Sequence, residues 1–356
     1  MQQLQFLGPR QYAWRDVPEP KLDSNEAALL RPLAVARCDL DLYIGLGQIP
    51  RRAPFAVGHE MVAEVLDVGD AVTTCRPGDR VCVSFQIHCG RCGPCQAGRP
   101  NACDAVPFGA NYGLGRCGGI DFGGAFSDVL RVPFANAMIV RLPADVDVAA
   151  AAHLADNAAD GYRTVAPHLR DEPGAAVLVV GGLAQSVGLF AAQAALGLGA
   201  ERVVYADADP GRLALAERLG VEPREVSLAA MPNAEAVFPI VVDACTLEPG
   251  RRFAIDSTAP GGICTSVSNG TEAMAELPLL EMYKRGVRYE ISRVQSRPML
   301  EEMLGHVCAG RWDPGALVTK RACFEDAAEL LTDPAPKLLF SRASVLPETP
   351  AQELAR

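Results

Sequence analysis

The pattern of hydrophobic and polar positions changes character partway along the chain. In the first 150 residues, short apolar or alternating runs such as 61–69 and 79–85 are separated by turns rich in Gly and Pro. Such runs predict a β-rich domain built from short strands. From about Asp156, apolar runs at 175–182, 201–209 and 237–245 alternate with alanine-rich or amphipathic stretches at 187–199 and 211–220. This order predicts a parallel sheet with crossover helices.

The last part of the chain returns to shorter, mixed elements from about Gly286. No internal repeat or low-complexity tract interrupts the pattern. The polar, Pro-containing stretch 345–356 is predicted to be a loosely held tail. The sequence therefore predicts an α/β protein of two domains followed by a short C-terminal segment.

Composition narrows the class of protein. The 356 residues include 43 acidic and 33 basic side chains, a net charge of −10, which argues against nucleic-acid or anionic-membrane partners. No apolar run is long enough to span a membrane, and the N-terminus does not resemble a secretory signal. We therefore expect a cytoplasmic protein, in which the twelve cysteines stay reduced and point to metal binding or catalysis rather than to disulfides.

Four of these cysteines lie within fifteen residues, with the spacing C-x2-C-x2-C-x7-C: Cys89, Cys92, Cys95 and Cys103. Four thiolates at such spacing suit a closed, tetrahedral structural zinc site. Ferredoxins also use C-x2-C-x2-C runs, but their fourth cysteine follows after three residues and precedes Pro. Here seven residues intervene and Asp104 follows. Clustered thiols without a metal would be reactive, so zinc is the prediction.

The segment "GHEMVAEVLDVGDAVTTCRPGDRVCVSF" at 58–85, followed by "CGRCGPC" at 89–95, closely resembles the zinc-dependent alcohol dehydrogenases of the medium-chain dehydrogenase/reductase family. The resemblance implies a GroES-like β-rich catalytic domain over 1–150 with the four-cysteine lobe at 89–103. It implies a Rossmann nucleotide-binding domain over 151–290, and a segment 291–356 that returns to the catalytic domain. The active site is then expected in the cleft between the two domains.

The resemblance also implies a catalytic zinc site. Cys38 and His59 match the first two family ligands, and Asp156, shortly before "GY", matches the third. Asp160 is the rival for that third place. Glu60 matches an acidic neighbour that can enter the zinc shell. Three ligands and one open position are what a catalytic zinc needs.

Other residues are assigned around this site by the same resemblance. Asp41 matches an Asp that orients the metal-bound histidine, and Phe85 falls at an aromatic wall of the substrate pocket. Leu40 departs from the family, which has a Ser or Thr there that begins a proton relay. Leu40 cannot do this, so the proton acceptor stays open among four candidates: Asp39, Glu60, Tyr43 and, more remotely, His153.

A glycine-rich turn follows the apolar run 175–180 and resembles a dinucleotide-binding loop. Gly181, Gly182 and Gly188 do not fit G-x-G-x-x-G, as though two residues were inserted; Gln185 or Ser186 is then a candidate to contact the pyrophosphate.

Near the end of the next strand, Asp207 matches the carboxylate that binds the adenosine ribose and favours NAD over NADP. The resemblance places Arg212 near the same ribose.

Further on, the resemblance makes Val267 to Asn269 candidates to flank the nicotinamide. Cys245 and Cys264 lie in apolar strands and are predicted to be buried hydrophobic residues. Arg293 and Arg297 are candidates to neutralise the pyrophosphate, or ordinary surface arginines.

The resemblance as a whole implies an NAD-dependent alcohol dehydrogenase or carbonyl reductase with two zinc ions per chain. Its substrate is expected to be a small-molecule alcohol, aldehyde or ketone, and its assembly a homodimer or homotetramer. Two alternatives stay open: a dismutase or lyase-type enzyme that uses tightly bound NAD, and a cofactor-binding relative with impaired catalysis.

Overall fold

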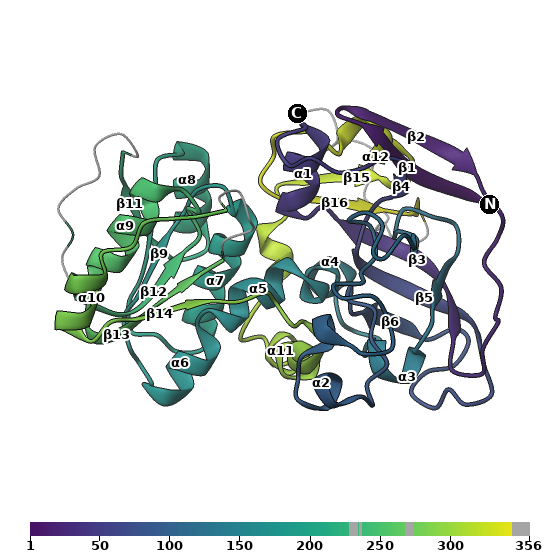
Figure 1. The fold of residues 1–356 in the computed structure, drawn as a ribbon, viewed down its shortest axis with the longest axis horizontal. Helices are drawn as coiled ribbons and strands as arrows, with labels where there is room; N and C mark the ends of the chain where they lie inside the picture. The colour runs from purple at the N-terminus through teal and green to yellow at the C-terminus, as the bar shows by residue number, and fades with distance from the viewer. Residues whose placement is uncertain (228–233, 235–236, 268–272, 344–356) are drawn as a thin grey trace. The chain divides into compact units, whose positions relative to one another are not determined.

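The computed structural model describes residues 1–227, 234, 237–267 and 273–343 (Figure 1). Within this part of the chain, contacts define two compact units. The first unit comprises residues 1–37 and 41–152, and the chain re-enters it at residue 318. The second unit comprises residues 38–40 and 153–317. The predicted tail, 345–356, lies outside the described residues.

The first unit is built on two sheets. A small sheet has the order β2-β1-β4, and a larger one has the order β15-β16-β3-β5-β6-β8, with β7 pairing β3. The strands are β1 (Gln2–Gly8), β2 (Gln11–Asp16), β3 (Ala28–Ala36), β4 (Phe55–Ala56), β5 (Glu60–Val68), β6 (Arg80–Val83), β7 (Leu130–Val132), β8 (Ile139–Arg141), β15 (Lys320–Cys323) and β16 (Leu338–Ser341). The short helices are α2 (Gly93–Gln96), η1 (Pro100–Ala102), α3 (Ala135–Met138), α4 (Val148–Ala152), η5 (Phe324–Asp326) and α12 (Ala327–Leu330), while α1 (Asp39–Gly45) begins in residues assigned to the second unit.

The larger sheet brings three distant segments together. β3 pairs antiparallel with β5, so that Ala36 faces Glu60, and it pairs on its other side with β16, so that Ala36 faces Leu339. Figure 1 shows β16, from the end of the chain, beside β3 from its beginning. The residues that leave β3, enter β5 and enter β16 therefore meet at one end of this sheet.

The second unit contains a six-stranded, wholly parallel sheet of order β11-β10-β9-β12-β13-β14. Numbered by their order in the chain, these strands run 3-2-1-4-5-6, the doubly wound arrangement of Rossmann domains. The predicted parallel sheet with crossover helices is confirmed. The strands are β9 (Val177–Val180), β10 (Val203–Asp207), β11 (Glu222–Glu225), β12 (Phe238–Asp243), β13 (Thr258–Ser266) and β14 (Arg288–Ile291). The helices are η2 (His153–Ala155), α5 (Asn157–Arg163), α6 (Ala166–Asp171), α7 (Gln185–Gly197), α8 (Pro210–Arg218), α9 (Glu248–Ser257), α10 (Leu279–Arg285), η3 (Arg297–Met299), α11 (Leu300–Cys308) and η4 (Pro314–Leu317).

Burial explains why the central elements of this unit are so apolar. All four residues of β9 and all five of β10 are buried, as expected for parallel strands covered on both faces. Helix α7 is likewise buried from Ser186 to Ala195, because it packs against β9, β10 and α5. The small side chains of α5 and α7 permit this close packing: a Cβ on Gly161 would lie 2.6 Å from the amide nitrogen of Ala191.

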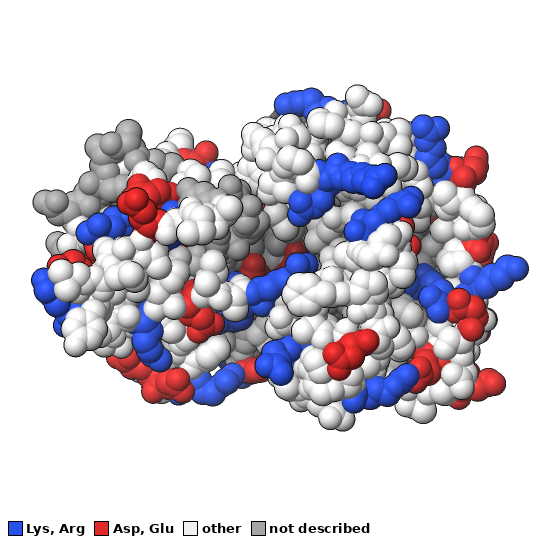
Figure 2. All heavy atoms as spheres, in the orientation of Figure 1, with Lys and Arg blue, Asp and Glu red and all other residues white. Residues whose placement is uncertain are grey.

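The surface carries charge of both signs. Figure 2 shows acidic and basic side chains interspersed on one face of the molecule, so the net charge of −10 is not gathered there into a single acidic field. No helix in the described part of the chain is both long and apolar enough to cross a membrane.

Candidate metal centres and nucleotide-binding loop

The structure brings the four cysteines of the 89–103 lobe together. One ligand atom from each of Cys89, Cys92, Cys95 and Cys103 lies within 4.8 Å of all the others. The helices α2 and η1 shape this loop. After the first of them, Gly98 adopts a φ of 72°, and its N–H donates a hydrogen bond to the carbonyl of Cys95. A residue with a side chain rarely adopts this left-handed conformation.

Backbone N–H groups donate hydrogen bonds to sulfur atoms in this lobe. The amides of Cys89 and Ala105 donate to Cys103 Sγ at 3.3 and 3.4 Å, and the amide of Asp104 donates to Cys92 Sγ at 3.5 Å. The bond from Asp104 and a second from the Cys95 backbone lower the pKa of Cys92 to about 7, whereas burial raises the pKa values of Cys95 and Cys103. N–H groups directed at sulfur stabilise the charged form, which is the form that binds a metal. The donor set therefore fits zinc.

A second group forms from residues far apart in the sequence. Cys38, His59, Glu60 and Asp156 are all buried, and one ligand atom from each lies within 4.8 Å of the others. A thiolate, an imidazole and carboxylates are the ligands that zinc prefers. The rival Asp160 instead pairs with Arg163, at 2.6 Å between Oδ1 and Nε. Among the described residues, the grouping therefore contains Asp156 and not Asp160.

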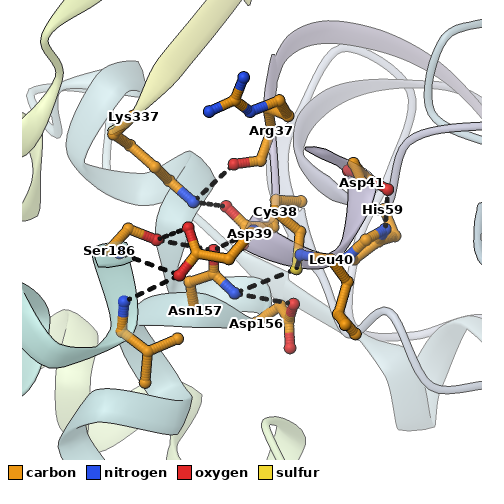
Figure 3. Close-up of polar contacts among 12 residues, drawn as sticks. Arg37, Cys38, Asp39, Leu40, Asp41, His59, Asp156, Asn157, Ser186 and Lys337 are labelled. Carbon is orange, nitrogen blue, oxygen red and sulfur yellow. Dashed lines mark hydrogen bonds and ion pairs between the residues drawn. The ribbon is translucent and has the colours of Figure 1, made fainter. Parts of the chain in front are cut away.

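Asn157 fixes two of these candidate ligands. Its Nδ2 donates to Cys38 Sγ and to Asp156 Oδ2, both at 3.2 Å. The amide of Leu40 also donates to Cys38 Sγ, at 3.4 Å. Figure 3 shows Asn157 beside both Cys38 and Asp156. Two N–H donors stabilise the thiolate of Cys38, and a shared amide sets the spacing between sulfur and carboxylate.

His59 is held by a tight segment at the start of β5. The preceding Gly58 has a φ of +91°, and a Cβ there would lie 2.7 Å from the ring of Phe126. The imidazole is fully buried; Asp41 Oδ1 lies 3.8 Å from its Nδ1, and the ring of Phe85 lies 5.5 Å away between centroids. Asp41 thus faces the histidine, and the buried Phe85 packs against it.

Glu60 is engaged by a lysine from the end of the chain. Lys337 Nζ lies 2.8 Å from Glu60 Oε2, and both side chains have no exposed surface. The same ammonium donates to the carbonyl of Arg37 at 2.9 Å, as Figure 3 shows. Arg37 in turn donates to the carbonyls of Asp333 and Ala335. The sheet register that joins β16, β3 and β5 creates this cluster.

The candidate proton acceptors lie in varied settings. Tyr43 is nearly buried, and His153 is fully buried, with its ring 5.3 Å from that of Phe190. Leu40, partly buried, presents no hydroxyl group. The relay position is therefore apolar, as expected from the sequence.

The glycines of the predicted cofactor loop have distinct packing roles. A Cβ on Gly181 would lie 2.2 Å from Asp207 Oδ2, and one on Gly182 would lie 2.6 Å from the Cα of Cys245. Gly188, within α7, would place its Cβ 2.9 Å from that of Ala244. Each glycine thus permits close approach of the loop or helix to the carboxyl ends of the strands, as in Rossmann domains.

Asp207 lies at the end of β10 and is almost wholly buried. It forms a bidentate ion pair with Arg212, at 2.7 Å for both N–O distances. Its oxygens also accept from the amide of Asp209 and from the hydroxyl of Tyr205, at 2.9 and 2.8 Å. Burial raises the pKa of Tyr205, which keeps this hydroxyl protonated as a donor. The predicted ribose carboxylate and its neighbouring arginine are therefore bonded to each other.

Asp39 occupies the amino end of α7. Its Oδ2 accepts from the amides of Ser186 and Val187 at 2.9 and 3.3 Å, and its Oδ1 accepts from Ser186 Oγ at 2.8 Å. Asn157 Oδ1 lies within hydrogen-bond distance of the Asp39 amide and of Ser186 Oγ. Ser186, a candidate for pyrophosphate contact, is thus bonded to a carboxylate in this structure (Figure 3).

The remaining candidates lie as follows. Val267 is buried just beyond β13, and its amide donates to the carbonyl of Asp243; Ser268 and Asn269 lie outside the described residues. Cys245 and Cys264 are fully buried, as predicted. Arg293 is exposed, and Arg297 pairs with Glu301 at 2.6 Å.

The sequence did not indicate Asn157 or Lys337. Asn157 directly follows a predicted ligand, but no spacing rule marks an amide that serves two ligands. Lys337 stands at the edge of the apolar run "LLFS". A lysine is rarely buried unless it is paired. A lysine beside a buried apolar run therefore indicates a buried ion pair, although the sequence does not identify the partner.

Comparison with known proteins agrees with this architecture. The alcohol dehydrogenase GroES-like domain model matches residues 24–144. A medium chain reductase/dehydrogenase of Acremonium sp. is 32% identical over 289 residues, which cover 77% of this chain and 95% of that protein. A probable zinc-binding alcohol dehydrogenase of Mycobacterium tuberculosis is 29% identical over 88% of this chain and 79% of its own length. Among solved structures, an alcohol dehydrogenase of Thermus sp. ATN1 superposes with a TM-score of 0.85 at 27% identity, covering 96% of this chain and all of that one.

The chain therefore belongs to the medium-chain reductase/dehydrogenase family. The family resemblance and the fold class predicted from the sequence are confirmed, and with them the general class of zinc-dependent oxidoreductases.

Proposed function

We propose that this protein transfers a hydride between NAD(H) and an alcohol or carbonyl substrate, with a zinc ion at Cys38, His59 and Asp156. One observation carries the proposal: these buried side chains and Glu60 offer ligand atoms within 4.8 Å of one another. A second group of four cysteines fits a separate structural zinc. We therefore expect about two zinc ions per chain.

Three residues would hold the catalytic metal. Cys38 and Asp156 share the amide of Asn157, and the carboxylate of Asp41 on the Nδ1 side of His59 favours metal binding through the other ring nitrogen. A bound zinc supplies Lewis-acid polarisation of the substrate oxygen, while a nicotinamide ring supplies the hydride acceptor or donor.

The chain's own residues constrain proton transfer. Leu40 has no hydroxyl with which to take a proton from the substrate. Glu60 is an acceptor by chemistry, but its Oε2 already receives the Lys337 ammonium at 2.8 Å. Release of an alcohol proton therefore has to use a group other than residue 40, and the pH dependence of turnover reports that group.

The cofactor end of the proposal is supported by Asp207. A carboxylate at the end of the second strand of a Rossmann sheet accepts hydrogen bonds from ribose hydroxyls and disfavours a 2′-phosphate. The ion pair with Arg212 reduces the negative potential that Asp207 presents. We therefore propose a preference for NAD over NADP that is smaller than an unpaired carboxylate would give.

Zinc analysis tests the metal assignment. The purified protein should contain about two zinc ions per chain. Asp156→Asn should lower this number toward one, because it weakens one of three ligands. Asp160→Asn, on the same stretch of chain but paired with Arg163, is the matched control and should keep both ions. Equal zinc loss in the two variants would contradict the assignment of Asp156.

Turnover tests the reaction. Primary and secondary alcohols, and the matching aldehydes and ketones, should be screened with NAD(H) and NADP(H) by absorbance of the reduced nicotinamide. Activity should depend on zinc and be higher with NAD(H). Turnover on no substrate by zinc-replete protein would refute the proposal. The predicted homodimer or homotetramer is tested separately by light scattering.

A further inference from the structure

The amino end of α7 already holds an anion that belongs to the chain. Helix N-termini bind anions because their first amides lack partners within the helix. In a Rossmann domain, the helix after the first strand uses these amides for the pyrophosphate of the dinucleotide. Here that strand is β9 and the helix is α7, and the amides of Ser186 and Val187 donate to the carboxylate of Asp39.

Two amides of the loop before the helix are also already in use. The amides of Leu183 and Ala184 donate to the carbonyls of Cys245 and Ala244, at 3.2 and 3.1 Å. Asp39 is itself 5% exposed, and Ser186 Oγ adds a third bond to its carboxylate. The carboxylate is therefore built into the unit rather than resting on its surface.

We propose that Asp39 is an internal competitor of the cofactor pyrophosphate and sets the affinity of this protein for dinucleotides. Two anions cannot share the amides of Ser186 and Val187, so a dinucleotide binds only when the Asp39 carboxylate moves away. The inference rests on the proposed nicotinamide-dependent function and adds to it a residue that weakens cofactor binding.

Movement of the Asp39 carboxylate would also affect the candidate metal ligands, because Asn157 connects them to Asp39 and Ser186 by hydrogen bonds. Ser186 Oγ lies 3.0 Å from Asn157 Oδ1, and the Asp39 amide lies 3.3 Å from that oxygen. The other end of the Asn157 amide donates to Cys38 and Asp156. Movement of Asp39 therefore changes the bonds that orient Asn157 between the two sites.

The test measures binding of ADP-ribose and of adenosine to the full chain by calorimetry. ADP-ribose carries the pyrophosphate, whereas adenosine carries no phosphate. Asp39→Asn removes the charge but keeps a side chain that caps helices well. We expect the Kd for ADP-ribose to fall about tenfold or more, because a like charge at hydrogen-bond distance is removed. The Kd for adenosine should change by less than about twofold, since no anion is involved.

Two further variants separate charge from folding. Asp313→Asn removes one acidic charge from a turn of the same unit, where Asp313 accepts from the amide of Gly315, and should leave both Kd values unchanged. Asp39→Ser gives a second neutral cap and should repeat the gain in ADP-ribose affinity. Unchanged or weaker ADP-ribose binding by folded Asp39 variants overturns the proposal, as does an equal gain in Asp313→Asn.

These measurements distinguish a failure of the Asp39 inference from a failure of the proposed hydride transfer. ADP-ribose binding that strengthens in Asp39→Asn, without turnover of any alcohol by the parent protein, supports this inference and refutes the proposed reaction. Turnover by the parent protein, with equal ADP-ribose binding by the parent and Asp39→Asn, supports the proposed reaction and refutes this inference. Absence of ADP-ribose binding in both proteins overturns the inference and the nicotinamide dependence together.

Discussion

The buried pair of Lys337 and Glu60 makes a demanding prediction about stability. Replacing Lys337 by Met keeps an unbranched side chain one atom shorter and removes its ammonium. Glu60 then remains in a place with no exposed surface, and the carbonyl of Arg37 loses a donor. The carboxylate has to be accommodated without the cation that lies 2.8 Å away in the intact protein.

The magnitude follows from this geometry. Two unit charges 2.8 Å apart attract by about 6 kcal/mol at an effective dielectric constant of about 20. Desolvation of both ions offsets much of this attraction in the intact pair, but removing one partner leaves the other buried at a cost of about 3–5 kcal/mol. For a unit of this size, such a loss lowers the Tm by roughly 10 °C.

Thermal unfolding of matched variants measures the effect. Lys320→Met breaks another lysine–carboxylate pair of the first unit, between Lys320 and Asp333 at 2.5 Å, whose side chains are 39% and 20% exposed. A partly exposed pair of this kind contributes about 1 kcal/mol or less. The double variant Lys337→Met with Glu60→Gln removes both buried charges and should recover most of the lost stability.

The reasoning fails if Lys337→Met and Lys320→Met lower the Tm equally. It also fails if the double variant is no more stable than Lys337→Met alone, because the cost would then come from lost packing rather than from an unpaired charge.

Three other substitutions test the site. Asn157→Ala removes the donor to Cys38 and should weaken zinc binding about 10–100-fold, which competition with a chelator measures; an unchanged zinc affinity would contradict the role of the amide. Gly58→Ala places a methyl group 2.7 Å from the ring of Phe126 at a φ of +91° and should cost about 1–3 kcal/mol, seen as a lower Tm; full stability would show that the turn relaxes freely. Cys103→Ser should reduce the zinc content from about two to about one per chain, while a retained second ion would show that three cysteines suffice.

Much of the fold was readable from the sequence, for local reasons. The largely apolar runs of β9 and β10, with the alanine-rich α7 between them, predicted a parallel sheet because such strands are buried on both faces. The four-cysteine lobe was equally readable, since its thiols lie within fifteen residues and no long-range packing is needed to bring them together.

The second metal group could be assigned only by resemblance. Cys38, His59 and Asp156 are separated by up to 118 residues in the sequence, and no spacing rule joins lone residues at such distances. Strand pairing brings Cys38 near His59, because β3 ends beside the start of β5. Within the second unit, Asn157 links Cys38 to Asp156 by donating a hydrogen bond to each.

The sequence by itself determined the class of the two units, the grouping of four cysteines in one short lobe and the types of residue available for a second metal site. Those properties depend on local patterns and on short loops. Only the tertiary structure decided that Lys337 neutralises Glu60 and that Asp39 caps α7, where a pyrophosphate is expected. Both contacts join residues at least 147 positions apart, and whether a charge is buried beside a partner or solvated alone depends on packing that no local pattern encodes.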